Sequence, residues 1–250
     1  MGVIDDYRER LRGLASWDAF LLAESRLPGP RGNLELVAAA ADVGNAPRFL
    51  ALLEHTPERA PTGTAAEFLA VCGAVGLGEC VARGDAAHWP RLRALANDPR
   101  WRVREGVAMA LQRIGDRDLP ELLRRIEPWL EGSPLERRAV VAGLCEPRLL
   151  RDPGVAKRVL GILDRVTASL AVERERRSEA VRVLRQALGY GWSVAVVAEP
   201  ERGRPRLERL AESPDADVRW IVRENLKKNR LRRLDAAWVE RLRARVSSFP

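Results

Sequence analysis

DPRWRVREGVAMALQRIGD, residues Asp98 to Asp116, is the stretch that decides the fold, because a second stretch near the other end of the chain can be laid over it. When Val103-Arg104 is placed on Val218-Arg219, further pairs coincide: Asp98-Pro99 with Ser213-Pro214, Val107 with Val222, and Leu111 with Leu226. Both stretches have a polar residue and a proline before a helix, then Val-Arg, then apolar residues at helical spacing. Two copies of one helical pattern predict an architecture of stacked repeats.

This pattern resembles the second helix of a HEAT repeat, and the chain as a whole resembles HEAT-repeat (armadillo-like) bacterial proteins. Second helices are expected to open near residues 32, 64, 99, 134, 174 and 215, which is the spacing of paired-helix repeats. No window alternates apolar and polar residues for long enough to predict a sheet. We therefore expect an all-α fold, an α-solenoid of about six stacked HEAT-like helix pairs, curved with a concave face.

The expected domain organisation is a single HEAT-like repeat domain over residues 1–250. Residues 1–30 form N-terminal capping helices, residues 31–230 the helix pairs, and residues 231–250 a C-terminal capping helix. The segment Gly189-Tyr190-Gly191 is expected to interrupt the helical pattern. The expected helices of the repeats and the last cap cover residues 34–43, 46–55, 65–82, 86–96, 100–114, 119–130, 135–144, 155–170, 173–188, 192–198, 207–211, 217–228 and 236–246.

Charge is distributed unevenly along the chain. The 250 residues hold 43 Lys and Arg against 35 Asp and Glu, for a formal net charge of +8. Residues 1–100 contribute −2, residues 101–150 +1, residues 151–200 +3 and residues 201–250 +6. A basic C-terminal part favours an anionic partner, although an excess of arginine is also typical of a GC-rich genome.

Targeting and redox signals point to the cytoplasm. The start of the chain is acidic and carries no apolar run, and the longest apolar window is too short to cross a membrane. The three cysteines, Cys72, Cys80 and Cys145, are an odd number without C-x-x-C spacing. We expect structural thiols in a reducing compartment.

The two aligned helices differ in the residues of their buried stripe. Gly106 and Ala110 in the first stripe are small, which would let a neighbouring helix approach closely. The second stripe includes Asn225 and Asn229, which conflict with burial. Either that helix frays at its end, or the two amides bind a loop or a ligand.

A basic stripe is expected on the outer side of the second helix, formed by Arg219, Arg223, Lys227 and Arg230. Like charges four residues apart oppose helix formation, by roughly 0.2–0.5 kcal/mol per pair, so an anion against the stripe would explain it. Trp220 borders the stripe, where it would stack on a base or pack against the next repeat. In HEAT repeats the arginine after the valine commonly binds a turn aspartate of the adjacent repeat, so Arg104 and Arg219 also have a structural interpretation.

No strong catalytic motif is present, and two histidines without a following glutamate predict neither metal nor cofactor. The first hypothesis is a non-enzymatic binding or scaffold protein, a monomer without a membrane role. Its basic concave face would hold nucleic-acid backbone or an acidic protein partner. The candidate contacts are Arg102, Arg104, Arg138, Arg177, Arg182, Arg219, Trp220, Arg223, Lys227 and Arg230.

Two other hypotheses stay open. WRVREGVAMALQRI, from Trp101, and WIVREN, from Trp220, resemble segments of the HEAT-like alkylpurine DNA glycosylases. That resemblance implies removal of alkylated bases by an enzyme with a catalytic aspartate, for which Asp98 is the candidate. It covers these two segments only, since residues 67–82 lack the expected tryptophan and aspartate. The remaining hypothesis is a scaffold or assembly factor with no nucleic-acid role.

Overall fold

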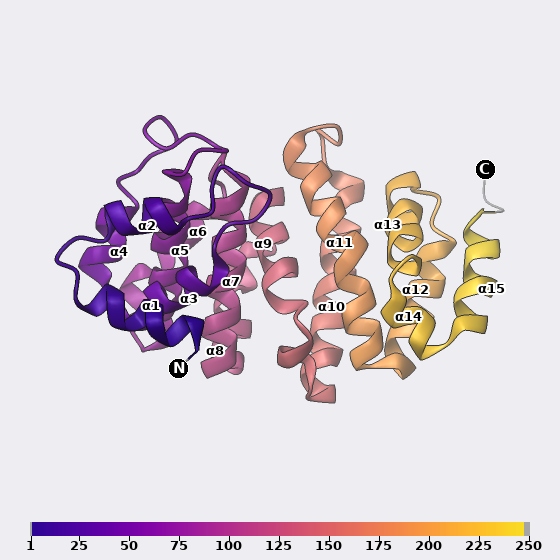
Figure 1. Cartoon of the computed structure of the whole chain (residues 1–250). Coiled ribbons are helices and arrows are strands. Elements are labelled where there is room, and N and C mark those ends of the chain that lie inside the picture. The colour runs from indigo at the N-terminus through magenta and orange to yellow at the C-terminus, as the bar shows by residue number, and fades with distance from the viewer. Residues whose placement is uncertain (1, 248–250) are drawn as a thin grey trace. The chain divides into compact units, whose positions relative to one another are not determined.

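The computed structural model describes residues 2–247, and within them every regular element is a helix and no strand occurs (Figure 1). The predicted all-α fold is therefore confirmed. The chain divides into two compact units, one ending at Leu123 and the other beginning at Arg124. Residues 1 and 248–250 of the predicted caps lie outside the described residues.

The N-terminal unit is built around α5, which contacts α2, α3, α4, α6 and α7. Helix α1 packs against α3, so that α1, α3, α5 and α7 follow one another in space. A 3-10 turn, Ala86–His88, precedes α6, and α8 (Leu119–Arg125) spans the division between the units. The helices are α1 (Val3–Arg12), α2 (Asp18–Glu24), α3 (Leu34–Val43), α4 (Ala46–Leu52), α5 (Glu67–Ala82), α6 (Trp89–Leu95) and α7 (Trp101–Arg117).

Helices α5 and α7 approach closely through small residues. The Cα of Gly78 faces Ala110, and a Cβ placed on Gly106 would lie 3.3 Å from the Cβ of Ala74. The sequence predicts that Gly106 and Ala110 of α7 let a neighbouring helix approach closely, and this prediction is confirmed. Val103, Val107, Leu111 and Ile114 of the same stripe are buried as well.

The C-terminal unit has the same kind of packing around α11. On its flanks α11 contacts α9 and α13, and α10 and α12 also pack against it. Three short 3-10 segments, Glu127–Trp129, Pro147–Leu150 and Leu170–Val172, connect the longer helices. The helices are α9 (Pro134–Leu144), α10 (Pro153–Ser169), α11 (Glu179–Ala198), α12 (Pro200–Ala211), α13 (Ala216–Leu226), α14 (Asn229–Leu234) and α15 (Ala236–Ser247).

Helix α11 is continuous through Gly189-Tyr190-Gly191, so the predicted break there is wrong. The two glycines serve close packing instead. A Cβ on Gly189 would lie 3.1 Å from the Trp220 ring, and one on Gly191 2.9 Å from Sγ of Cys145. Glycine destabilises an isolated helix by about 1 kcal/mol relative to alanine, but here it permits two neighbouring helices to pack against α11.

The starts of several helices follow from polar N-cap residues. The Asn33 side chain accepts a hydrogen bond from the N–H of Leu36, Ser133 from Glu136, and Ser178 from Val181. The Ser178 cap explains why α11 starts at Glu179 and not at residue 173 as predicted. The other expected second helices begin at residues 34, 67, 101, 134 and 216, close to their predicted openings.

The packing role of glycine predicts opposite effects for two alanine substitutions. Gly78→Ala places a methyl group against the backbone of Ala110, and such overpacking costs about 1–3 kcal/mol. Gly161→Ala, in α10, meets nothing within 4 Å and should raise the free energy of unfolding by about 0.4–1 kcal/mol. Urea unfolding followed by circular dichroism measures both, and equal shifts for the two variants would contradict the packing role.

Candidate functional site

Arg104 and Arg219 occupy matching positions in α7 and α13 and make the same hydrogen bonds. Nη1 of Arg104 donates to the carbonyls of Asp98 (2.8 Å) and Pro99 (2.9 Å). Nη1 of Arg219 donates to the carbonyls of Ser213 (2.8 Å) and Pro214 (2.9 Å). Each arginine thus binds the turn before its own helix, which explains why the two stretches align and gives both arginines a structural task.

Asp98 lies in a buried clamp with Arg100. Its Oδ1 accepts from the Arg100 backbone N–H (2.8 Å) and Nε (2.9 Å), and its Oδ2 accepts from Nη2 (2.8 Å). Nη1 of Arg100 continues to the carbonyls of His55 and Ala60. The carboxylate is therefore held inside the fold, and any catalytic use of it would require Arg100 to release it.

Because the Asp98–Arg100 pair is buried, removing the carboxylate should destabilise the fold. Asp98→Ala leaves a guanidinium that is 3% exposed without its counter-charge, and breaking a buried pair this way costs about 3–5 kcal/mol. Asp6→Ala removes an exposed carboxylate, 3.8 Å from Arg10, and should change stability by less than about 1 kcal/mol. Chemical denaturation tests both, and a fully stable Asp98→Ala protein would argue against the structural role.

Asn225 joins α13 to the middle of α11. Its Nδ2 donates to the carbonyls of Leu188 (2.9 Å) and Ile221 (2.8 Å), and its Oδ1 accepts from the N–H of Ser193 (2.7 Å). The side chain is fully buried and its polar atoms all have partners. Neither alternative expected from the sequence describes Asn225, which binds the backbone of two helices and no loop or ligand. Asn229 is exposed, because α13 ends at Leu226.

The two asparagines give a matched pair of variants. Asn225→Ala removes three buried hydrogen bonds and should cost about 2 kcal/mol or more, since each buried polar group left unpaired costs roughly 1–3 kcal/mol. Asn229→Ala should shift stability by less than about 0.5 kcal/mol, as exposed substitutions generally do. Thermal unfolding at equal protein concentration compares them, and the same melting temperature for both would overturn the assignment.

Trp220 belongs to a network that ties α13 to α11. The guanidinium carbon of Arg185 lies 4.5 Å from the centre of the Trp220 ring, and Arg185 also pairs with Asp217. Arg176 binds Asp215 (2.7 Å) and Asp217 (2.8 Å). The hydrogen bond from Arg176 holds the pKa of Asp215 below its ordinary value. The turn acids are thus neutralised by Arg176 in the loop before α11 and by Arg185 on α11, and the half-buried Trp220 packs against Arg185.

Tyr190 is the centre of a cationic cluster that sequence reasoning missed. Tyr190 is 43% exposed, and the guanidinium carbon of Arg230 lies 4.6 Å from its ring centre, while Nη2 of Arg230 donates to the phenol oxygen (2.6 Å). Nζ of Lys228 lies 5.8 Å from the same ring. The buried Trp192 faces α10, where its Nε1 donates to the Thr167 hydroxyl (3.0 Å). Tyr190 lies two positions earlier, about 200° around the helix, so it faces away from α10. We call Tyr190, Lys228 and Arg230 the tyrosine cluster.

The remaining candidate arginines and lysine have different surroundings. Arg182 is exposed on α11. Arg177 is exposed in the loop before α11, although the predicted helix 173–188 includes it. Arg138 is half-buried on α9 and Arg223 on α13. Lys227 pairs with Glu224, and Arg230 belongs to α14, so the predicted stripe does not lie on one helix.

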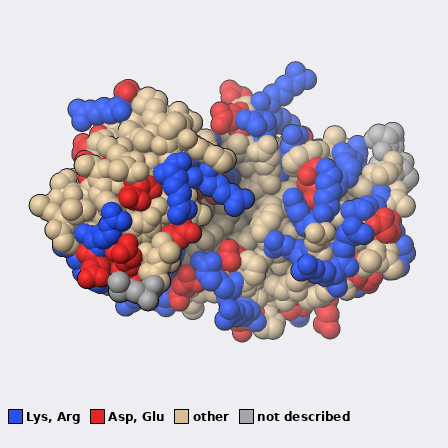
Figure 2. Space-filling view, in the orientation of Figure 1, with Lys and Arg blue, Asp and Glu red and all other residues tan. Residues whose placement is uncertain are grey.

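The two units differ sharply in charge. Residues 1–123 hold 15 Lys and Arg against 17 Asp and Glu, for a net charge of −2. Residues 124–250 hold 28 against 18, for a net charge of +10. Lys and Arg are prominent over the C-terminal unit on the face drawn in Figure 2, in its right half. The positive field of the protein therefore arises from this unit.

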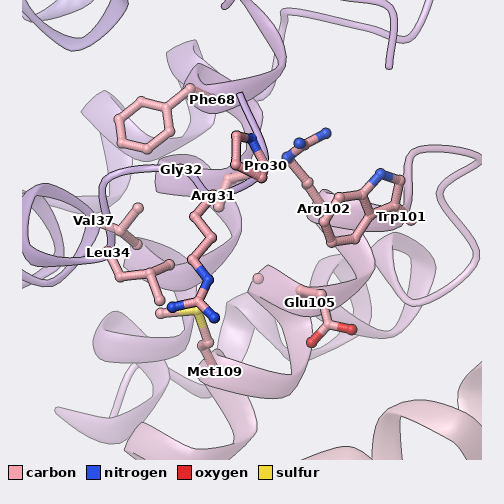
Figure 3. A pocket seen from close by; sticks show the side chains of 12 residues that line it. Pro30, Arg31, Gly32, Leu34, Val37, Phe68, Trp101, Arg102, Glu105 and Met109 are labelled. Carbon is pink, nitrogen blue, oxygen red and sulfur yellow. The ribbon is translucent and has the colours of Figure 1, made fainter. Parts of the chain in front are cut away.

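The N-terminal unit contains a cavity of about 420 Å³ (Figure 3). Its apolar lining includes Leu34, Val37, Phe68 and Met109. The candidate Arg102 also lines it, and binds Glu67 (3.2 Å) and the carbonyl of Gly29 (2.9 Å). No periodic signal in the sequence predicts this cavity, because its residues come from α3, α5, α7 and the loop before α3.

Cys72, Cys80 and Cys145 are free and buried, and burial raises the pKa of the Cys145 thiol to about 12. Among residues 2–247 no three His, Cys, Asp or Glu side chains are grouped so that they could hold a metal ion. No helix in that range combines the length and the apolar character needed to cross a bilayer.

Comparison with known proteins gave no match to any family model, curated protein or solved structure.

Proposed function

We propose that this chain is a non-enzymatic, HEAT-like helical-repeat protein whose C-terminal unit binds an extended polyanion, and that the polyanion is nucleic acid. The observation that carries the proposal is the net charge of +10 on residues 124–250 together with the exposed tyrosine cluster. In this proposal the successive second helices α9, α11 and α13 form one wall of an α-solenoid. A line of phosphates fits a row of basic side chains on such a wall.

The basic side chains divide into those used by the fold and those available to a partner. Arg176 and Arg185 neutralise turn acids, and Arg219 binds a turn. By contrast, Arg182, Arg223 and Lys228 have no ion pair with any described acidic residue. Since no described carboxylate neutralises their charge, an external anion is a favourable counter-charge for them.

The tyrosine cluster favours nucleic acid over an acidic protein. Phosphates are attracted by Lys228 and Arg230, and an exposed aromatic ring beside them offers a surface on which an unpaired base stacks. Base stacking on an aromatic side chain contributes about 1–3 kcal/mol per base. An acidic peptide would use the cations but would gain less from the exposed ring.

The buried state of Asp98 favours binding over base excision. A DNA glycosylase of the kind that the two short segments resemble needs a carboxylate in contact with the lesion, whereas both oxygens of Asp98 are bound by Arg100. The proposed protein should therefore release no free methylated purine from alkylated DNA. The same incubation with an active glycosylase serves as the positive control.

Salt titration tests the binding proposal. The full-length protein should bind random single-stranded and duplex DNA at low salt, with affinity falling steeply as salt increases. The triple variant Arg223→Gln, Lys228→Gln, Arg230→Gln should reduce the salt slope on duplex DNA by about 2–3, since each lost phosphate contact removes about 0.9. Fluorescence anisotropy with a labelled oligonucleotide measures this slope.

The matched control changes three exposed cations of the N-terminal unit, Arg12→Gln, Arg59→Gln and Arg91→Gln. It alters the net charge equally and should leave the slope near that of the unchanged protein. Equal losses in the two variants would show that net charge alone attracts the DNA. Undetectable binding to either form of DNA at low salt would overturn the proposal, and nuclease-resistant capture of an acidic protein would replace it.

A further inference from the structure

The cavity of the N-terminal unit combines a buried apolar lining with exposed apolar side chains at its edge. Val37 and Phe68 are at most 1% exposed, whereas Leu34 is 55% and Trp101 45% exposed. Large apolar side chains that remain exposed around a hollow mark a surface that another molecule covers. The volume of the cavity, about 420 Å³, lies within the range of roughly 300–1,000 Å³ that is typical of small-molecule pockets.

The charges around this cavity leave one cation without a counter-charge. Arg102 is neutralised by Glu67, whose side chain is fully buried, and its guanidinium lies 4.3 Å from the centre of the Trp101 ring. Glu105 also lines the cavity, but already has an interaction of its own. Arg31 is exposed and forms no hydrogen bond or ion pair with a described residue. In Figure 3 its side chain extends from the loop in the direction of Leu34 and Met109.

We propose that this cavity binds a small amphipathic carboxylate, with the apolar chain against Val37, Phe68 and Met109 and the carboxylate on Arg31. A guanidinium presents two parallel N–H groups that match the two oxygens of a carboxylate. One free cation beside an apolar lining suits a single negative charge on an apolar body. A medium-chain fatty acid has this chemistry, and the proposal does not depend on nucleic-acid binding by the other unit.

Isothermal titration of the full-length protein with decanoate tests the proposal, with decanol as the uncharged probe of the same chain length. Decanoate should bind with a stoichiometry of one. Arg31→Gln should weaken decanoate at least tenfold and leave the weaker binding of decanol unchanged, because only the carboxylate uses the guanidinium. Arg59→Gln, which removes another exposed arginine of the same unit, is the matched control and should bind decanoate normally.

A second variant tests the apolar part of the site. Met109→Trp fills the cavity and should abolish the binding of both probes, with circular dichroism confirming that the variant is folded. If this variant does not fold, Arg31→Gln alone decides, since its side chain is exposed. The proposal is overturned by the absence of saturable binding at 1 mM decanoate, which we set as roughly the weak limit of specific ligand binding. Equal decanoate affinity of Arg31→Gln and the unchanged protein would overturn it as well.

Discussion

The fold depends on helix backbones coming close enough for their apolar faces to interlock. In the N-terminal unit this contact is made where Gly78 meets Ala110 and Gly106 meets Ala74. In the C-terminal unit Gly189 and Gly191 let α13 and α9 pack against the two flanks of α11. A larger side chain at these points would separate the helices and open voids on both sides of the contact, which a tightly packed interior tolerates poorly.

Glycine shows how far local sequence reasoning reaches. Gly106 lies on an otherwise complete apolar stripe, so its role in close packing could be predicted from helical periodicity alone. Gly189 and Gly191 flank a tyrosine and follow a long helical pattern, where the same residue type more commonly ends a helix. Whether these glycines end the helix or serve close packing depends on the ring of Trp220 and the thiol of Cys145, which are distant in sequence.

The polar residues were harder to place than the apolar ones. The pairing of Asp98 with Arg100 and the carbonyl contacts of Arg104 depend on the path of the turn, which a helical wheel does not describe. Asn225 was recognised as a conflict with burial, but its partners on α11 could not be named from sequence. The tyrosine cluster is not predictable from periodicity, because it joins α11 to α14 and the glycines beside its tyrosine predict a helix break. Periodicity therefore predicted the helices and much of the core, whereas the arrangement of candidate binding residues required the packed structure.

The matching bonds of Arg104 and Arg219 also bear on how such a chain can grow. Each arginine satisfies two carbonyls of the turn that leads into its own helix, so this turn and its helix carry the donor and the acceptors within one short segment. A segment that supplies both partners can be duplicated without a compensating change elsewhere. The entries into α7 and α13 are thus held by the same pair of bonds, although the two helices begin in different units.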